Sequence, residues 1–225
     1  MLDDIIQSYN EAVFETDRMA ALNVVDRALA QGVTAEEVVF KVVIPAIETM
    51  MSLIASDPDA NLAQHFMTSQ IAVEVTEKML PKFRNSPEVV GRVVIGTAHG
   101  DLHSLGKRIV MGCLKAMMVE VVDLGVNVSA EHFIDEAVRL DAQVIGISAM
   151  MVHTAMGEEG CRKVRARLQE RGLTDRIKLV VGGAPYRFDP NLYQAVGADA
   201  WAEDGINAAK VIIELIREVK RHDTP

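Results

Sequence analysis

The second half of this chain alternates short apolar runs with amphipathic stretches, and no other feature of the sequence constrains its fold as strongly. The apolar runs cover residues 93–98, 119–124, 144–150 and 178–181, with a shorter one near 198–202, and an amphipathic stretch covers 205–221. Strands that alternate regularly with helices are typical of a parallel sheet with right-handed crossovers and helices on both faces. Residues 89–225 are therefore expected to form a flavodoxin-like or Rossmann-like, doubly wound parallel sheet of five strands.

The first 81 residues carry helical patterns only. Helices are expected over residues 2–14, from a cap at Asp17 to a stop at Gly32, onward from a capping box at Thr34 and Glu37, and over 61–80. Pro45 lies inside the third of these helices and predicts a kink. Four helices with short connections suggest a small antiparallel bundle. We thus expect a helical bundle at 1–81, a polar linker at 82–88 and an α/β domain at 89–225.

The composition excludes several classes of partner. The chain carries 23 Lys and Arg against 32 Asp and Glu, with a formal net charge of −9 and no basic stripe, which argues against nucleic acid. No apolar run approaches the length that crosses a membrane, and the first residues lack the pattern of a secretory leader. Cys113 and Cys161 fall in separate expected helices and form no zinc or redox motif. A cytoplasmic protein with no membrane and no nucleic-acid partner is therefore expected.

The first apolar run is followed directly by a glycine-flanked polar loop, Gly-Asp-Leu-His-Ser-Leu-Gly, at residues 100–106. Ligands of open α/β sheets bind outside the carboxyl ends of the strands, where this loop would lie. The carboxylate of Asp101 could accept the ring N–H of His103, which would fix the tautomer and raise the basicity of the other ring nitrogen. His103 is therefore a candidate metal ligand. On this segment alone, a hydrogen-bonded pair on the surface is the commoner explanation.

Two later segments are expected at the same edge of the sheet. Ser148 lies near the end of the third apolar run, shortly before Thr154, and Gly182-Gly183 directly follows the fourth. In the strand order 2-1-3-4-5 these segments share one crevice with the loop of His103. Each has a plainer explanation by itself, because serine suits a strand end, threonine a helix N-cap and paired glycines a tight turn. The order and separation of all three segments together favour a binding site.

Together these motifs resemble the cobalamin-binding domain of the base-off, histidine-on type, which is found in methionine synthase, in carbon-skeleton mutases and in the corrinoid proteins of methyltransferase systems. The signature of that family is D-x-H-x-x-G, then S-x-L, then G-G, and this chain has Asp101-x-His103-x-x-Gly106, Ser148-Ala149-Met150 and Gly182-Gly183. Met150 replaces the leucine of the signature, which conserves apolar volume. Ser104 stands where methyltransferase corrinoid proteins usually have aspartate. The helical part is similar, more weakly, to the cap that precedes this domain in methionine synthase and the corrinoid proteins.

The resemblance implies roles for individual residues. His103 would be the lower axial ligand to cobalt in place of the dimethylbenzimidazole of the cofactor, with Asp101 and Thr154 as its hydrogen-bond relay. Ser148 and Gly182-Gly183 would border the slot for the nucleotide tail. The residues implied to contact the corrinoid are Asp101, Leu102, His103, Ser104, Leu105, Gly106, Ser148, Met150, Val152, Thr154, Gly182 and Gly183. On the cap, His65, Phe66 and Gln70 would be candidates to face the upper side of the cofactor, with a solvated helix face as the alternative.

The function that the resemblance implies is methyl transport by a protein that does not complete a reaction alone. Cobalamin or a related corrinoid, with methylcobalamin as the intermediate, would carry a methyl group from a substrate-specific methyltransferase to a second methyltransferase with a pterin or thiol acceptor. A reductive activator would be a further partner, and no residue of the chain is expected to be catalytic by itself. A cobalamin-dependent sensor or antirepressor, and the cobalamin-binding subunit of a mutase, are the alternatives, which genomic context would separate. The methyl donor is left open.

Overall fold

The computed structural model describes residues 2–56, 62–84, 89–157 and 159–222. The chain divides into two compact units, one of residues 1–88 with 112–118 and one of residues 89–111 with 119–225. The first unit is helical and the second is built on a β-sheet. A short piece near 112–118, within the second half of the chain, thus groups with the helices, a detail that no sequence pattern predicted.

Four long helices make up the described part of the helical unit. They are α1 (Leu2–Phe14), α2 (Arg18–Ala30), a continuous helix formed by α3 (Ala35–Glu37), the π-helical segment η1 (Val38–Val43) and α4 (Ile44–Ser56), and α5 (Leu62–Met79), which a short 3₁₀ turn, η2 (Leu80–Lys82), extends. Helix α1 packs on α2, α4 and α5, and its buried Tyr9 and Val13 belong to the core. The predicted four-helix bundle is confirmed.

The predicted helix starts are stabilised by side-chain caps. The carboxylate of Asp17 accepts the N–H of Ala20 at 2.9 Å, and Thr34 and Glu37 form the reciprocal capping box. Pro45, for which a kink was predicted, is the second residue of α4. The structure has the wide π-helical turns of η1 directly before it, in which the N–H of Ile44 donates to the carbonyl of Val39, five residues back. Because proline has no N–H and its ring crowds the carbonyl four residues earlier, a locally wider helix accommodates it.

The second unit contains a parallel sheet of five strands. The strands are β1 (Arg92–Thr97), β2 (Glu120–Asp123), β3 (Val144–Ser148), β4 (Lys178–Gly182) and β5 (Ala200–Ala202). They pair in the order β2-β1-β3-β4-β5, and every pair is parallel. The predicted flavodoxin-like strand order is therefore confirmed. The strands at the two edges are the shortest, with four residues in β2 and three in β5.

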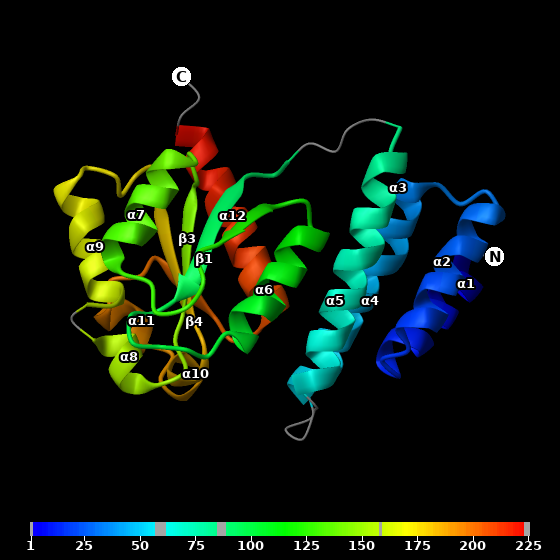
Figure 1. Cartoon of the computed structure of the whole chain (residues 1–225), viewed down its shortest axis with the longest axis horizontal. Helices are drawn as coiled ribbons and strands as arrows, with labels where there is room; N and C mark the ends of the chain where they lie inside the picture. The colour runs from blue at the N-terminus through cyan, green and yellow to red at the C-terminus, as the bar shows by residue number, and fades with distance from the viewer. Residues whose placement is uncertain (1, 57–61, 85–88, 158, 223–225) are drawn as a thin grey trace. The chain divides into compact units, whose positions relative to one another are not determined.

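Helices cover both faces of this sheet. The helices that begin in this half of the chain are α6 (Leu105–Ala116), α7 (Ala130–Arg139), α8 (Val152–Met156), α9 (Cys161–Glu170), α10 (Ala184–Phe188), α11 (Leu192–Ala195) and α12 (Gly205–His222). Figure 1 shows α7 and α9 on one face of the sheet, and α12 on the other together with the first turns of α6. Phe133, Ile145, Leu168 and Leu179 are fully buried between the sheet and the α7–α9 layer. Among the described helices, none combines the length and apolar character that a membrane span requires.

The register of the sheet decides where the predicted site residues lie. Thr97 of β1 is paired with Ser148 of β3, and Ser148 is paired with Gly182 of β4, so these three strands end side by side. The loop of His103 leaves the sheet at this edge, and the short helices α8 and α10 begin there, at the lower end of the sheet in Figure 1. This carboxyl edge therefore gathers segments that are far apart in the sequence.

Candidate functional site

The centre of the candidate site is the carboxylate of Asp101, whose side chain is fully buried, with an exposed fraction of 0%. Its Oδ1 lies 2.9 Å from both the main-chain N–H and the ring Nδ1 of His103. Its Oδ2 accepts the main-chain N–H of Met150 at 2.7 Å and the hydroxyl of Thr154 at 2.9 Å. Four donors from three segments of the chain thus converge on one carboxylate.

These contacts determine the charge of Asp101. Burial by itself raises the pKa of a carboxyl group, because the charged form loses its hydration. The hydrogen bonds from Met150, His103 and Thr154 lower the pKa by more than burial raises it, so the pKa of Asp101 lies below its usual value. Asp101 is therefore ionised at neutral pH and accepts from all four donors.

His103 lies above this carboxylate with half of its side chain in solvent, at an exposed fraction of 55%. With Asp101 ionised, Nδ1 carries the ring proton and donates a hydrogen bond to Oδ1. Nε2 then keeps its lone pair, so it is the nitrogen available to a metal. Asp101 and His103, in the loop between β1 and α6, thus present an imidazole in a fixed tautomer.

Thr154 does not lie at the N-cap of a helix, which was the alternative explanation for it. The N-cap of α8 is Met151, and Thr154 lies inside that helix, so the alternative of an N-cap role is wrong. Its buried hydroxyl lies 2.9 Å from both Asp101 Oδ2 and the carbonyl of Met151. The side chain is therefore part of the Asp101 cluster.

Glycine and serine residues let the neighbouring loops approach closely. The N–H of Ala149 donates to the carbonyl of Gly182 at 3.0 Å, and the N–H of Ala98 donates to that of Ser148 at 2.9 Å. Gly183 has a φ of +113°, and a Cβ placed on it would lie 2.0 Å from the carbonyl oxygen of Ala149. Gly106 has no such conflict, since a Cβ there would lie 3.7 Å from Ser148 Oγ. Gly183 is thus required by the backbone, whereas Gly106 is not.

Exposed apolar side chains lie on the loops and short helices that follow β1, β3 and β4. Leu102 is 70% exposed, and Leu105, Met150 and Val152 are also exposed, while Ser104 is half-buried. Two further members, Met156 on α8 and Phe188 at the end of α10, were not predicted; Phe188 is 89% exposed. Apolar side chains that gather on a surface in this way are typical of a contact with another molecule.

The donors and the surface at this edge fit a corrinoid. His103 supplies one nitrogen of the kind that suits first-row transition metals, and the exposed apolar side chains of this edge suit a broad, flat ring. At Gly183 the loops after β3 and β4 approach so closely that no side chain would fit between them. Elsewhere in the described part of the chain, no three His, Cys, Asp or Glu side chains form a group that could hold a metal ion.

The three predicted upper-face residues lie on α5, in the other unit. Gln70 is exposed and Phe66 is half-buried, and the side chain of His65 lies outside the described residues. Gln70 also lines a small pocket of about 260 Å³ with Arg18, Met67 and Glu74. These residues are not part of the cluster around Asp101.

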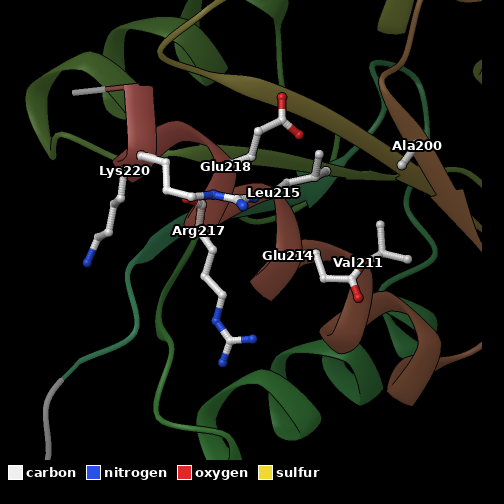
Figure 2. Close-up of a pocket in the computed structure, with 8 residues that line it drawn as sticks. Ala200, Val211, Glu214, Leu215, Arg217, Glu218 and Lys220 are labelled. Atoms are coloured by element: carbon white, nitrogen blue, oxygen red, sulfur yellow. The ribbon is translucent and has the colours of Figure 1, made fainter. Parts of the chain in front are cut away.

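A broad groove of about 990 Å³ lies on the sheet unit, along the second half of α12 (Figure 2). Its lining consists of Ala200, Val211, Glu214, Leu215, Arg217, Glu218, Lys220 and Arg221. Lys178, the first residue of β4, lies 3.0 Å from Glu218, which places this part of α12 beside the amino ends of the strands. The groove therefore lies away from the carboxyl edge and contains none of the predicted site residues.

Comparison with known proteins identifies the sheet unit. Residues 91–211 match the family model of the B12 binding domain, which is more than half of the chain. The chain is 31% identical to trimethylamine corrinoid protein 2 of Methanosarcina mazei, over 93% of this chain and 95% of that protein. It is 32% identical to dimethylamine corrinoid protein 3 of Methanosarcina acetivorans, over 96% of this chain and 98% of that protein.

A solved structure supports the same fold for the whole chain. The methanol:cobalamin methyltransferase complex of Methanosarcina barkeri contains a chain that superposes with a TM-score of 0.73 and 21% identity, over 98% of this chain and 84% of that one. With the match of the B12 binding domain and full-length relatives above 30% identity, this chain belongs to the cobalamin-binding corrinoid proteins of corrinoid-dependent methyltransferase systems.

Proposed function

We propose that this corrinoid protein is a methyl carrier, which passes a methyl group from a substrate-specific methyltransferase to a second methyltransferase with a pterin or thiol acceptor. The observation that carries the proposal is the half-exposed imidazole of His103, fixed through Nδ1 by the buried Asp101, on a B12 binding domain. When bound, the corrinoid supplies a cobalt that can take up and release a methyl group. A reductive activator would complete the system.

The protein's own residues hold and orient the cofactor. His103 is the proposed ligand through Nε2, and Asp101 holds the proton on Nδ1 and orients the ring. Met150 N–H and the Thr154 hydroxyl fix the carboxylate from the other side. Room for the nucleotide tail is proposed to be left by Gly106, Ser148, Gly182 and Gly183. A second group is proposed to lie under the ring and exclude water: Leu102, Ser104, Leu105, Met150 and Val152.

The remaining parts of the proposal concern the partners and the helical unit. The names of the relatives make methylamines the first donors to test, and the methanol:cobalamin methyltransferase complex supports a methyltransferase as partner. Residues 1–81 are proposed to act as a cap, with His65, Phe66 and Gln70 facing the upper side of the cofactor. A cytoplasmic location is proposed because both cysteines are buried thiols, which suits a reducing compartment.

The first prediction concerns the axial ligand. Purified protein reconstituted with cobalamin should bind one corrinoid per chain, with the imidazole of His103 in place of dimethylbenzimidazole. Electron paramagnetic resonance of the Co(II) form should give the splitting of one axial nitrogen. That splitting should not change when the dimethylbenzimidazole carries nitrogen-15, whereas labelling the histidines of the protein should change it. A response to the labelled base would exclude His103 as the ligand.

The second prediction concerns the space for the nucleotide tail. Gly106→Leu should weaken cobalamin binding at least about tenfold, or about 1.4 kcal/mol, because the side chain would fill space beside Ser148. The cofactor-free fold should be unchanged or slightly more stable, since leucine is the better helix former. Gly183→Leu should also block binding, but it strains the backbone at Ala149, so its thermal unfolding has to be measured alongside. His103→Ala should lose less affinity than either. Parent-like binding by Gly106→Leu, measured by titration, would place the tail elsewhere.

The third prediction concerns the charge on Asp101. An asparagine has one acceptor oxygen, so in Asp101→Asn either Met150 N–H loses its acceptor or the amide faces the two N–H groups of His103. We expect a loss of about 10–100-fold in ligand affinity. The Co(II)/Co(I) midpoint potential should rise by about 59 mV for each tenfold loss, because the axial ligand stabilises the oxidised state. Asp141→Asn, an exposed carboxylate 80% accessible, is the control for charge alone. Equal potentials for both variants would leave Asp101 with a purely structural role.

The fourth prediction tests methyl transport itself. The reconstituted, reduced protein should take up a methyl group from a methylamine when its cognate methyltransferase is added, and should release the group to a thiol or pterin when a second methyltransferase follows. The visible spectrum of the corrinoid reports each transfer. A protein that binds cobalamin but exchanges no methyl group with any methyltransferase of a methylamine, methanol, betaine and aryl-ether panel would favour the sensor alternative.

A further inference from the structure

The connection between β2 and α7 lies directly against the backbone of the His103 loop. Its residue Asn127 accepts the main-chain N–H of Gly100 with its side-chain oxygen at 2.7 Å. The main-chain N–H of Asn127 lies 2.9 Å from the carbonyl oxygen of Asp101. Asn127 has a φ of +54°, in the left-handed region that asparagine tolerates better than most residues. A single residue from another strand connection thus holds both sides of the turn that leads to Asp101.

Thr97, the last residue of β1, is hydrogen-bonded to the same carbonyl group. Its hydroxyl is fully buried, donates to the carbonyl of Asp101 at 2.5 Å and accepts the N–H of Asn127 at 2.9 Å. The N–H of Thr97 donates to the carbonyl of Gly125, in the same connection as Asn127. The backbone of Asp101 is therefore fixed by Thr97 and Asn127, while its carboxylate fixes His103.

The start of the β2–α7 connection is also tied to the helix that follows His103. The ammonium group of Lys107, on the first turn of α6, pairs with Asp123 at the end of β2, and only 2% of the Lys107 side chain is exposed. The same carboxylate accepts the N–H of Gly125 at 2.8 Å. A buried ammonium group is costly to leave without a partner, so this contact holds the connection to α6. The loop of His103 is thus fixed to one connection at both of its ends.

We infer that Thr97 and Asn127 are positioning residues, which set the position and orientation of the His103 imidazole through the backbone of Asp101. This inference rests on the proposed role of His103 as a metal ligand. Because Asp101 and His103 are two residues apart and share the hydrogen bonds described above, a shift of the Asp101 backbone moves Nε2 as well. The affinity of His103 for the metal then depends on side chains that do not touch the ligand.

The test measures the ratio of histidine-bound to histidine-free cofactor in the Co(II) form, by electron paramagnetic resonance of the cobalamin-loaded protein. Asn127→Gly removes the acceptor for Gly100 and keeps both the left-handed backbone and the main-chain N–H. Thr97→Val removes the hydroxyl and keeps the shape. Each should lower the ratio about tenfold, at the lower end of what partners outside the metal shell contribute, because both act through Asp101. Asn127→Asp and Thr97→Ser restore the acceptor and the hydroxyl, and should return the ratio close to that of the parent.

Asp141→Gly is the matched control. Asp141 also has a left-handed backbone, with a φ of +52°, but it lies between α7 and β3 at the amino edge of the sheet, so its replacement should leave the ratio unchanged. If Asn127→Gly and Thr97→Val keep the ratio of the parent, the inference is wrong and His103 as ligand stands. If the parent itself shows no histidine nitrogen, the proposed ligand and this inference both fall. A folding failure of the variant at one position leaves the variant at the other as the test.

Discussion

The buried carboxylate of Asp101 is the interaction on which the candidate site depends. A carboxylate without water is stable only when donors replace its hydration, and here the donors come from the His103 loop, from the end of β3 and from α8. The removal of any one donor leaves a charged oxygen partly unsatisfied. The position of the proposed ligand is therefore coupled to the packing of three separate segments of the carboxyl edge.

Much of the fold could be predicted because its strands are continuous apolar runs and its helices are amphipathic. The strand ends were less accurate, as in β2, where the predicted run 119–124 is longer than the pairing of Glu120–Asp123 with β1. Pro45 shows a different limit. The sequence identified a disturbance in the helix, but the wide turns of η1, in which Val39 and Val43 are buried, were not predicted.

The site was predictable where its contacts are local in sequence. Asp101 and His103 are two residues apart, so their hydrogen bond could be expected from the loop alone. Thr154 is distant, and its place inside α8 follows from a helix start at Val152 that no capping side chain marks. The main-chain N–H of Met150 and the side chain of Asn127 reach the cluster only through the path of their loops. The exposed Phe188 had no signal, since a sequence gives no hint that an aromatic residue after a strand stays in solvent.

The short edge strands have a consequence for how copies of this protein behave at high concentration. An exposed sheet edge offers unpaired main-chain groups to which a strand of another molecule can add, and long, uncharged edges aggregate most readily. Here β2 offers four residues that begin and end with an exposed carboxylate, Glu120 and Asp123, and β5 offers only three. Copies of the chain therefore have little opportunity to join their sheets. At high concentration, copies should therefore associate reversibly through their side chains. Strand addition, which is much harder to undo, should be rare.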